Sequence, residues 1–124
     1  MRICISRIDK MGDMILSLPA IKSIKINNPN IFIKLLASEN NSRLLNNITY
    51  IDEIEIIKTK KNVFSIIKLL YRFRKQRYDF YINLSPTVLS YIFCYFSNSN
   101  KKATLIFFSR YKKNNFSKFI IKFF

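Results

Sequence analysis

Glycine and histidine are almost absent from this sequence of 124 residues, which contains one glycine, Gly12, and no histidine. A dinucleotide-binding turn needs several glycines, and a P-loop needs a glycine-rich loop before its lysine, so both motifs are excluded in their usual form. Without histidine, the chain offers no Ser-His-Asp or Cys-His arrangement and no imidazole metal ligand. Any catalysis by this chain would therefore depend on side chains other than histidine.

Cysteines and long apolar runs are also scarce. The two cysteines, Cys4 and Cys94, lack the paired spacing of a zinc site or a disulfide framework, so we expect both to be buried in a reducing compartment. The longest apolar run, residues 88–96, is about half of the ~20 residues that a membrane-spanning helix needs. Charged residues interrupt the apolar N-terminus from position 7, which argues against a signal peptide. These features predict a cytoplasmic protein.

Acidic residues are few and unevenly placed. The chain has 7 acidic and 22 basic residues, a formal net charge of +15, and no acidic residue after Asp79. Such a charge implies attraction to a polyanion: nucleic acid, an anionic membrane surface or a phosphorylated substrate. The charge alone does not distinguish among them.

Apolar patterning predicts alternating strands and helices in one domain, residues 1–108. We expect strands at residues 2–6, 31–36, 54–57, 79–84 and 103–108. Helical spacing begins at residue 13, after residue 38 or 40, at residue 63 and at residue 86. This alternation predicts an α/β fold, with a Rossmann-like, open, mostly parallel sheet and helices on both faces.

The single glycine lies in the turn between the first expected strand and helix. Because glycine tolerates positive φ and close approach to the backbone, we expect this turn to need it. Ligands bind beyond the carboxyl ends of the strands in such sheets, so this turn and the loop at residues 85–87 are the candidate site. In that loop, Ser85 is expected to cap a helix that starts at Pro86.

Asp13, directly after the glycine, has two interpretations. It could cap the first helix, which its spacing favours, because aspartate is among the commonest capping residues. It could instead be a general base that takes a proton from a substrate hydroxyl. Arg7 and Lys10, at the end of the strand, are either solvated loop charges or contacts to an anionic substrate.

Several segments resemble glycosyltransferase family 9, the family of lipopolysaccharide heptosyltransferases. The resemblance rests on RICISRIDKMGDMILSLPAI at residues 2–21, Asn28-Pro29, YIDE at residues 50–53 and YDFYINLSP at residues 78–86. It covers residues 1 to about 102. The Gly-Asp pair followed by Leu-Pro-Ala-Ile is its most specific part.

The resemblance implies the N-terminal, acceptor-binding half of a GT-B fold. A nucleotide-sugar donor would bind a C-terminal domain that these residues do not contain, so we expect the chain to be a fragment that is inactive alone. The acceptor would be a lipid-linked or lipopolysaccharide-core glycan, and transfer would be inverting and require neither a metal nor another cofactor. Asp13 would be the catalytic base. The expected substrate contacts are Arg7, Lys10, Met11, Gly12 and Ser85.

Residues 109–124 mix basic and aromatic side chains. They are either the start of a further core element or a helix that lies on the inner face of an anionic membrane, which would suit a lipid-linked acceptor. The alternative to the enzyme is a non-catalytic basic module that binds an anionic membrane surface or nucleic acid. Nucleic acid is the less favoured partner, because no base-reading motif is present.

Overall fold

The computed structural model describes residues 1–58, 60 and 62–106. The segment 109–124 and the last two residues of the expected fifth strand lie outside the described residues. The elements follow in the order β1 (Arg2–Arg7), α1 (Met11–Asn27), β2 (Phe32–Ser38), α2 (Glu39–Ser42), η1 (Arg43–Leu45), β3 (Glu53–Ile57), α3 (Val63–Arg74), β4 (Arg77–Asn83), α4 (Val88–Phe96) and β5 (Asn98–Thr104).

The five strands of the described residues form one parallel sheet in the order β3-β2-β1-β4-β5. The central strand β1 pairs with β2 and β4, so that Ile3 lies beside both Ile33 and Phe80. The chain winds outward from β1 through β2 to β3, and then crosses to β4 on the other side. The predicted Rossmann-like α/β fold is confirmed, with its switch point between the carboxyl ends of β1 and β4.

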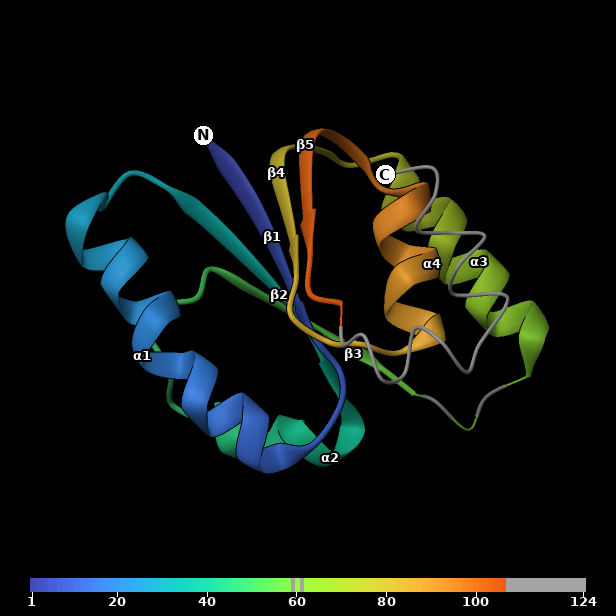
Figure 1. Ribbon diagram of the computed structural model, residues 1–124, viewed down its shortest axis with the longest axis horizontal. Helices are drawn as coiled ribbons and strands as arrows, with labels where there is room; N and C mark the ends of the chain where they lie inside the picture. Colours follow the sequence, from blue (N-terminus) through green and yellow to red (C-terminus); the bar gives the residue numbers. More distant parts are fainter. Residues whose placement is uncertain (59, 61, 107–124) are drawn as a thin grey trace.

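Helices cover both faces of the sheet (Figure 1). Ile3 and Ile5 of β1 pack toward α1, while Cys4 points to the other face, in the cluster that contains Phe73 of α3 and Phe93 of α4. Both cysteines are free and buried, as predicted, and burial raises the pKa of Cys94 to about 12. Among the described helices, none combines the length and apolarity that crossing a bilayer would require.

The predicted position of the fifth strand is wrong. The strand begins at Asn98 and ends at Thr104, whereas the apolar pattern had placed it at residues 103–108. β5 is polar and mostly exposed at one side of the described sheet, so it carries no buried apolar pattern that a sequence analysis could detect.

The start of α1 also differs from the prediction. The helix begins at Met11 with Lys10 at its N-cap position, so Asp13 lies inside the first turn and is not the N-cap. Gly12 does not have positive φ, and a Cβ atom placed there would meet no other atom within 4 Å. The fold itself therefore does not require glycine at this position. Pro19 does not end the helix, which continues to Asn27.

Candidate active site

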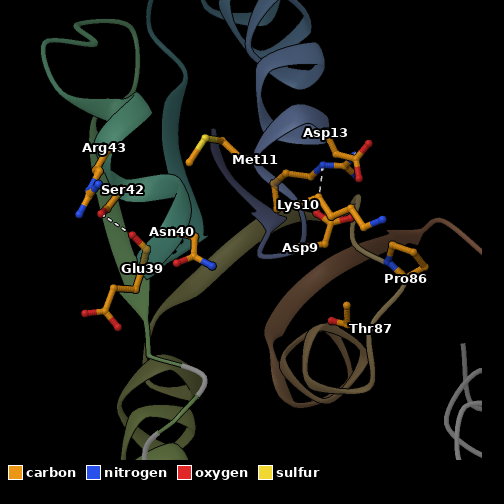
Figure 2. A pocket seen from close by; sticks show the side chains of 11 residues that line it. Asp9, Lys10, Met11, Asp13, Glu39, Asn40, Ser42, Arg43, Pro86 and Thr87 are labelled. Atoms are coloured by element: carbon orange, nitrogen blue, oxygen red, sulfur yellow. Dashed lines mark hydrogen bonds and ion pairs between the residues drawn. The ribbon is translucent and has the colours of Figure 1, made fainter.

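A cleft of about 1230 Å³ lies at the switch point, where the carboxyl ends of β1 and β4 meet. Three segments line it: the turn from β1 into α1, the short helix α2 with the start of η1, and the loop before α4 (Figure 2). The lining residues are Arg7, Asp9, Lys10, Met11, Asp13, Glu39, Asn40, Ser42, Arg43, Pro86 and Thr87.

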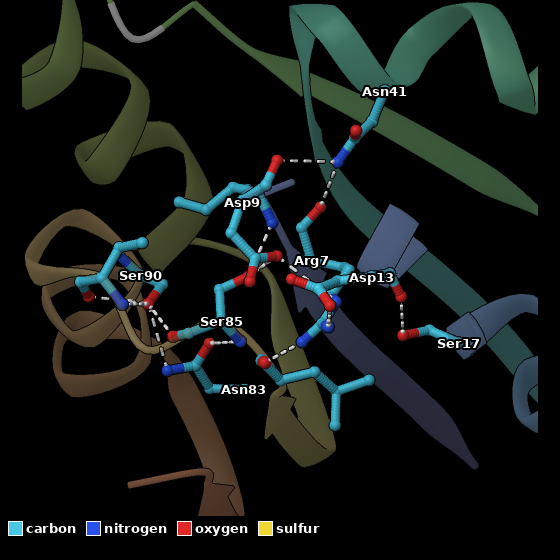
Figure 3. A network of polar contacts seen from close by, with 11 residues as sticks. Arg7, Asp9, Asp13, Ser17, Asn41, Asn83, Ser85 and Ser90 are labelled. Carbon is cyan, nitrogen blue, oxygen red and sulfur yellow. Dashed lines mark hydrogen bonds and ion pairs between the residues drawn. The ribbon is translucent and has the colours of Figure 1, made fainter. Parts of the chain in front are cut away.

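Arg7 is the most strongly fixed of these residues. Its side chain is 11% exposed, and Nη1 donates a hydrogen bond to the backbone carbonyl of Leu84, after β4. Its Nε lies 3.3 Å from Asp9 Oδ1, and its Nη2 lies 3.4 Å from Asp13 Oδ1 (Figure 3). Arg7 is therefore not a solvated loop charge, because it joins β1, the loop after β4 and the first turn of α1.

Asp13 places a carboxylate on the cleft from the first turn of α1. Its side chain is 42% exposed, and one oxygen faces Arg7. The backbone carbonyl of Asp13 accepts a hydrogen bond of 2.7 Å from Ser17 Oγ. The carboxylate of Asp13 is therefore held beside the Arg7 guanidinium and stays open to the cleft.

Ser85 and Asp9 connect the two loops beneath the cleft. Ser85 Oγ donates to Asp9 Oδ1 at 3.0 Å and accepts a hydrogen bond of 2.7 Å from the Ile8 amide. Ser85 is fully buried and does not line the cleft, so its predicted contact with substrate stays a prediction. Its predicted role as a helix cap is wrong, because Thr87 occupies that position.

The loop before α4 is held by a capping box. Thr87 Oγ1 accepts from the Ser90 amide, and Ser90 Oγ accepts from the Thr87 amide, both at 3.3 Å. Asn83 at the end of β4 accepts from the Ser85 amide at 3.1 Å and donates to Thr104 Oγ1 at 3.0 Å. These bonds fix the backbone on which Pro86 and Thr87 face the cleft.

Asn41 supports the other wall and was not predicted from the sequence. It is buried in α2, and its Nδ2 donates to the carbonyls of Arg7 at 3.2 Å and Asp9 at 3.4 Å. Arg43 and Glu39, also not predicted, line the cleft from the same wall. Their place in the sequence could have indicated them, because these polar residues follow the carboxyl end of β2, a strand that the sequence did predict.

The structure brings together most of the other predicted site residues. Lys10 and Met11 are exposed and line the cleft, on the wall opposite Asn40 and Arg43 (Figure 2). Gly12 is exposed beside Met11, with open space where a side chain would project. In the described part of the chain, no three His, Cys, Asp or Glu side chains gather as a metal-binding group would.

Comparison with solved structures identifies the same fold in glycosyltransferases. The chain superimposes on a glycosyltransferase family 9 protein from Veillonella parvula DSM 2008 with a TM-score of 0.74 and 19% identity, covering 87% of this chain and 32% of that one. It matches the E. coli heptosyltransferase WaaC with ADP with a TM-score of 0.70 and 16% identity, covering 83% and 35% of the two chains. It matches E. coli ADP-heptose lipopolysaccharide heptosyltransferase II with a TM-score of 0.69 and 20% identity, covering 84% of this chain and 30% of that one.

The chain spans about a third of the length of each of these structures. No protein-family model matches the sequence, and no curated protein matches it significantly. The likeness therefore concerns the three-dimensional structure, and it agrees with the resemblance seen in the motifs. The chain has the Rossmann-like fold that is found in glycosyltransferases of family 9.

Proposed function

We propose that this chain is the acceptor-binding domain of a family 9-like glycosyltransferase, with Asp13 as its catalytic base. The observation that carries the proposal is the pair formed by Asp13 and Arg7: an accessible carboxylate faces the cleft, and the guanidinium of the mostly buried Arg7 side chain lies 3.4 Å from it. The donor would be a nucleotide sugar bound by a second domain outside these 124 residues.

In the proposed reaction, Asp13 accepts the proton of an acceptor hydroxyl while the hydroxyl oxygen attacks the anomeric carbon of the donor. A new glycosidic C–O bond forms, and the bond from the anomeric carbon to the nucleoside diphosphate breaks. The diphosphate leaves with the electron pair, and the configuration is inverted. This chain contributes acceptor positioning and proton removal, and the scheme requires no metal ion.

Three cations and three carboxylates line the cleft, and two of the cations are available to phosphate groups of an acceptor. Lys10 and Arg43 are exposed and lie on opposite walls, while Arg7 is already committed to Asp9 and Asp13. We therefore assign acceptor contacts to Lys10, Met11 and Arg43, and a positioning role to Arg7. A lipopolysaccharide core or a related lipid-linked glycan, at the inner face of the cytoplasmic membrane, is the proposed acceptor class.

The test is to join this chain to the donor domain of a family 9 enzyme and to measure sugar transfer to a lipopolysaccharide-core acceptor. Asp13→Asn should lower kcat at least about a hundredfold with little change in KM, because a general base acts in the transition state. Asp79→Asn, at the opposite end of the sheet, is the matched control and should leave kcat unchanged. Unimpaired transfer by Asp13→Asn would remove Asp13 from the mechanism.

The non-catalytic alternative rests on the basic charge that no acidic residue offsets after Asp79, and on the aromatic residues of the segment 109–124. The segment 109–124 lies outside the described part of the chain, so the alternative stays a prediction. It is tested separately, by deleting this segment and measuring the salt dependence of nucleic-acid and vesicle binding.

A further inference from the structure

The outer face of α3 exposes a stripe of large apolar side chains. Its members are Val63, Phe64, Ile67 and Tyr71, of which Phe64 is 77% exposed and Tyr71 is 65% exposed. Their spacing of three and four residues places them on one side of the helix. Phe73, on the same helix, is by contrast buried against the sheet.

The helix therefore has two apolar faces, and the sheet covers one of them. Water-exposed apolar residues are ordinary when scattered, whereas a contiguous stripe indicates an interaction surface. The stripe is independent of the cleft, because none of its residues lines that site.

Cations border the exposed stripe. Lys68, Arg74 and Lys75 lie beside it on the helix, and Lys75 Nζ is 4.7 Å from the centre of the Tyr71 ring. Residues 58–77 contain eight basic residues and no acidic one. The nearby carboxylate of Glu55 is paired with Lys34 and Arg72, so it does not offset the charge of the exposed face.

We propose that this face of α3 docks on an anionic lipid bilayer. Apolar and aromatic side chains bordered by lysine and arginine match a bilayer interface, where the apolar groups enter the headgroup region and the cations meet anionic lipids. The net charge of +15 supplies long-range attraction to the same surface. The proposal concerns binding alone and does not depend on glycosyl transfer.

The orientation of the docked domain follows from the topology. α3 begins after the carboxyl end of β3, which is the end of the sheet where the cleft lies (Figure 1). The first turn of α3, with Val63 and Phe64, is therefore the part of the stripe at the cleft end of the molecule.

The test uses the full chain and vesicles of phosphatidylglycerol with phosphatidylethanolamine, with partitioning measured by co-sedimentation. The double variant Phe64→Ser/Ile67→Ser should lower the partition coefficient at least about tenfold, because two large apolar groups no longer enter the interface. Ile26→Ser is the matched control, since Ile26 is equally exposed on a helix on the other face of the sheet. It should bind as the parent chain does.

A charge-reversal pair tests the electrostatic part of the proposal. Lys68→Glu should weaken binding several-fold more than Lys22→Glu, which makes the same change in net charge on α1. Circular dichroism and thermal unfolding should be unchanged in every variant, because the altered side chains are solvent-exposed.

Three outcomes would overturn the proposal. The first is undiminished vesicle binding by the double variant, which would assign binding to another part of the chain, such as residues 109–124. The second is equal binding to vesicles of phosphatidylcholine alone. The third is a parent chain that dimerises without binding vesicles and becomes monomeric in the double variant, which would identify a second copy as the occupant of this face.

Discussion

Arg7 and Asp13 have different environments, although they form one ion pair. The arginine side chain is only 11% exposed and is bonded to two separate loops, while the aspartate side chain is 42% exposed on the cleft. A buried charge that loses its partners is costly, whereas an exposed charge is stabilised by water. The contribution of the pair to stability is therefore expected to come mainly from Arg7, and Asp13 contributes less to the fold.

We expect Arg7→Leu to lower the free energy of unfolding by roughly 3 kcal/mol, because it leaves the Asp9 carboxylate, which is only 11% exposed, without its cation. Asp13→Asn should change it by less than about 1 kcal/mol, because the side chain is well solvated. Urea unfolding followed by circular dichroism measures both. Arg43→Leu, at an exposed arginine of the same cleft, is the control and should be close to neutral. Equal destabilisation by Asp13→Asn and Arg7→Leu would contradict this division of roles.

Both residues line the cleft at the mouth of the sheet, where the sequence predicted the candidate site, and their roles there stay predictions. Both follow a strongly apolar strand, and that position predicts the mouth of a parallel sheet. Arg7 donates a hydrogen bond to the carbonyl of Leu84, which lies 77 residues away, so no local pattern could reveal this contact. The prediction that Asp13 caps the helix is wrong for a local reason. The first helical turn begins at Met11, after Lys10, which makes no side-chain capping bond.

Among the elements, those with buried apolar faces were the ones that sequence patterning located well. The strands β1 and β4 and the helices α3 and α4 lie within a few residues of their predicted positions. The position of β5 was predicted wrongly because an exposed strand needs no alternation of apolar residues. Its backbone pairing with β4 holds it in the sheet although its composition is polar.

Asp52 connects three elements through one carboxylate. Its Oδ2 accepts hydrogen bonds of 2.7 Å from the Ile33 amide in β2 and 2.8 Å from Lys25 Nζ in the last turn of α1. It lies in the segment that leads into β3. Burial acts to raise the pKa of Asp52, but the hydrogen bonds from Lys25 and Ile33 outweigh burial and hold it below its ordinary value of 3.8.

This lowered pKa predicts a pH-dependent contribution to stability. The ionised carboxylate is favoured in the folded state, so its contribution is complete above the unfolded pKa and is lost as pH falls through the lower, folded pKa. Asp52→Asn should therefore destabilise the protein at neutral pH, and the difference should shrink at acidic pH below about 4. Urea titrations across this range measure it, with Glu39→Gln as a control for charge. A difference that stays constant with pH would show that Asp52 acts only through packing.

At the scale of the whole molecule, alternating patterns were enough to predict the fold class but not the strand order. Strands separated by helices favour a parallel sheet wherever they occur. The order β3-β2-β1-β4-β5 depends on pairing across long sequence distances, such as Ile5 with Ile82, and neither strand alone specifies that partner. The switch point, and with it the cleft, follows from the order.

The same strand order predicts an uneven distribution of stability. β1 is paired on both sides and buried along most of its length, whereas β5 pairs only with β4 among the described strands and is largely exposed. Amides of β1 should therefore exchange with solvent only through global unfolding, and those of β5 through local opening, with protection at least about a hundredfold lower.

Native-state hydrogen exchange followed by NMR tests this distribution, with β3, at the other side of the described sheet, as the internal comparison. Adding mild denaturant should accelerate exchange in β1 strongly and in β5 weakly, because global unfolding exposes much more surface than local opening does. Protection of β5 equal to that of β1 would contradict the prediction, and would mean that another strand covers β5 in solution. Because exchange is measured residue by residue, the result would also show whether the carboxyl ends of β1 and β4, which support the cleft, belong to the most stable part of the molecule.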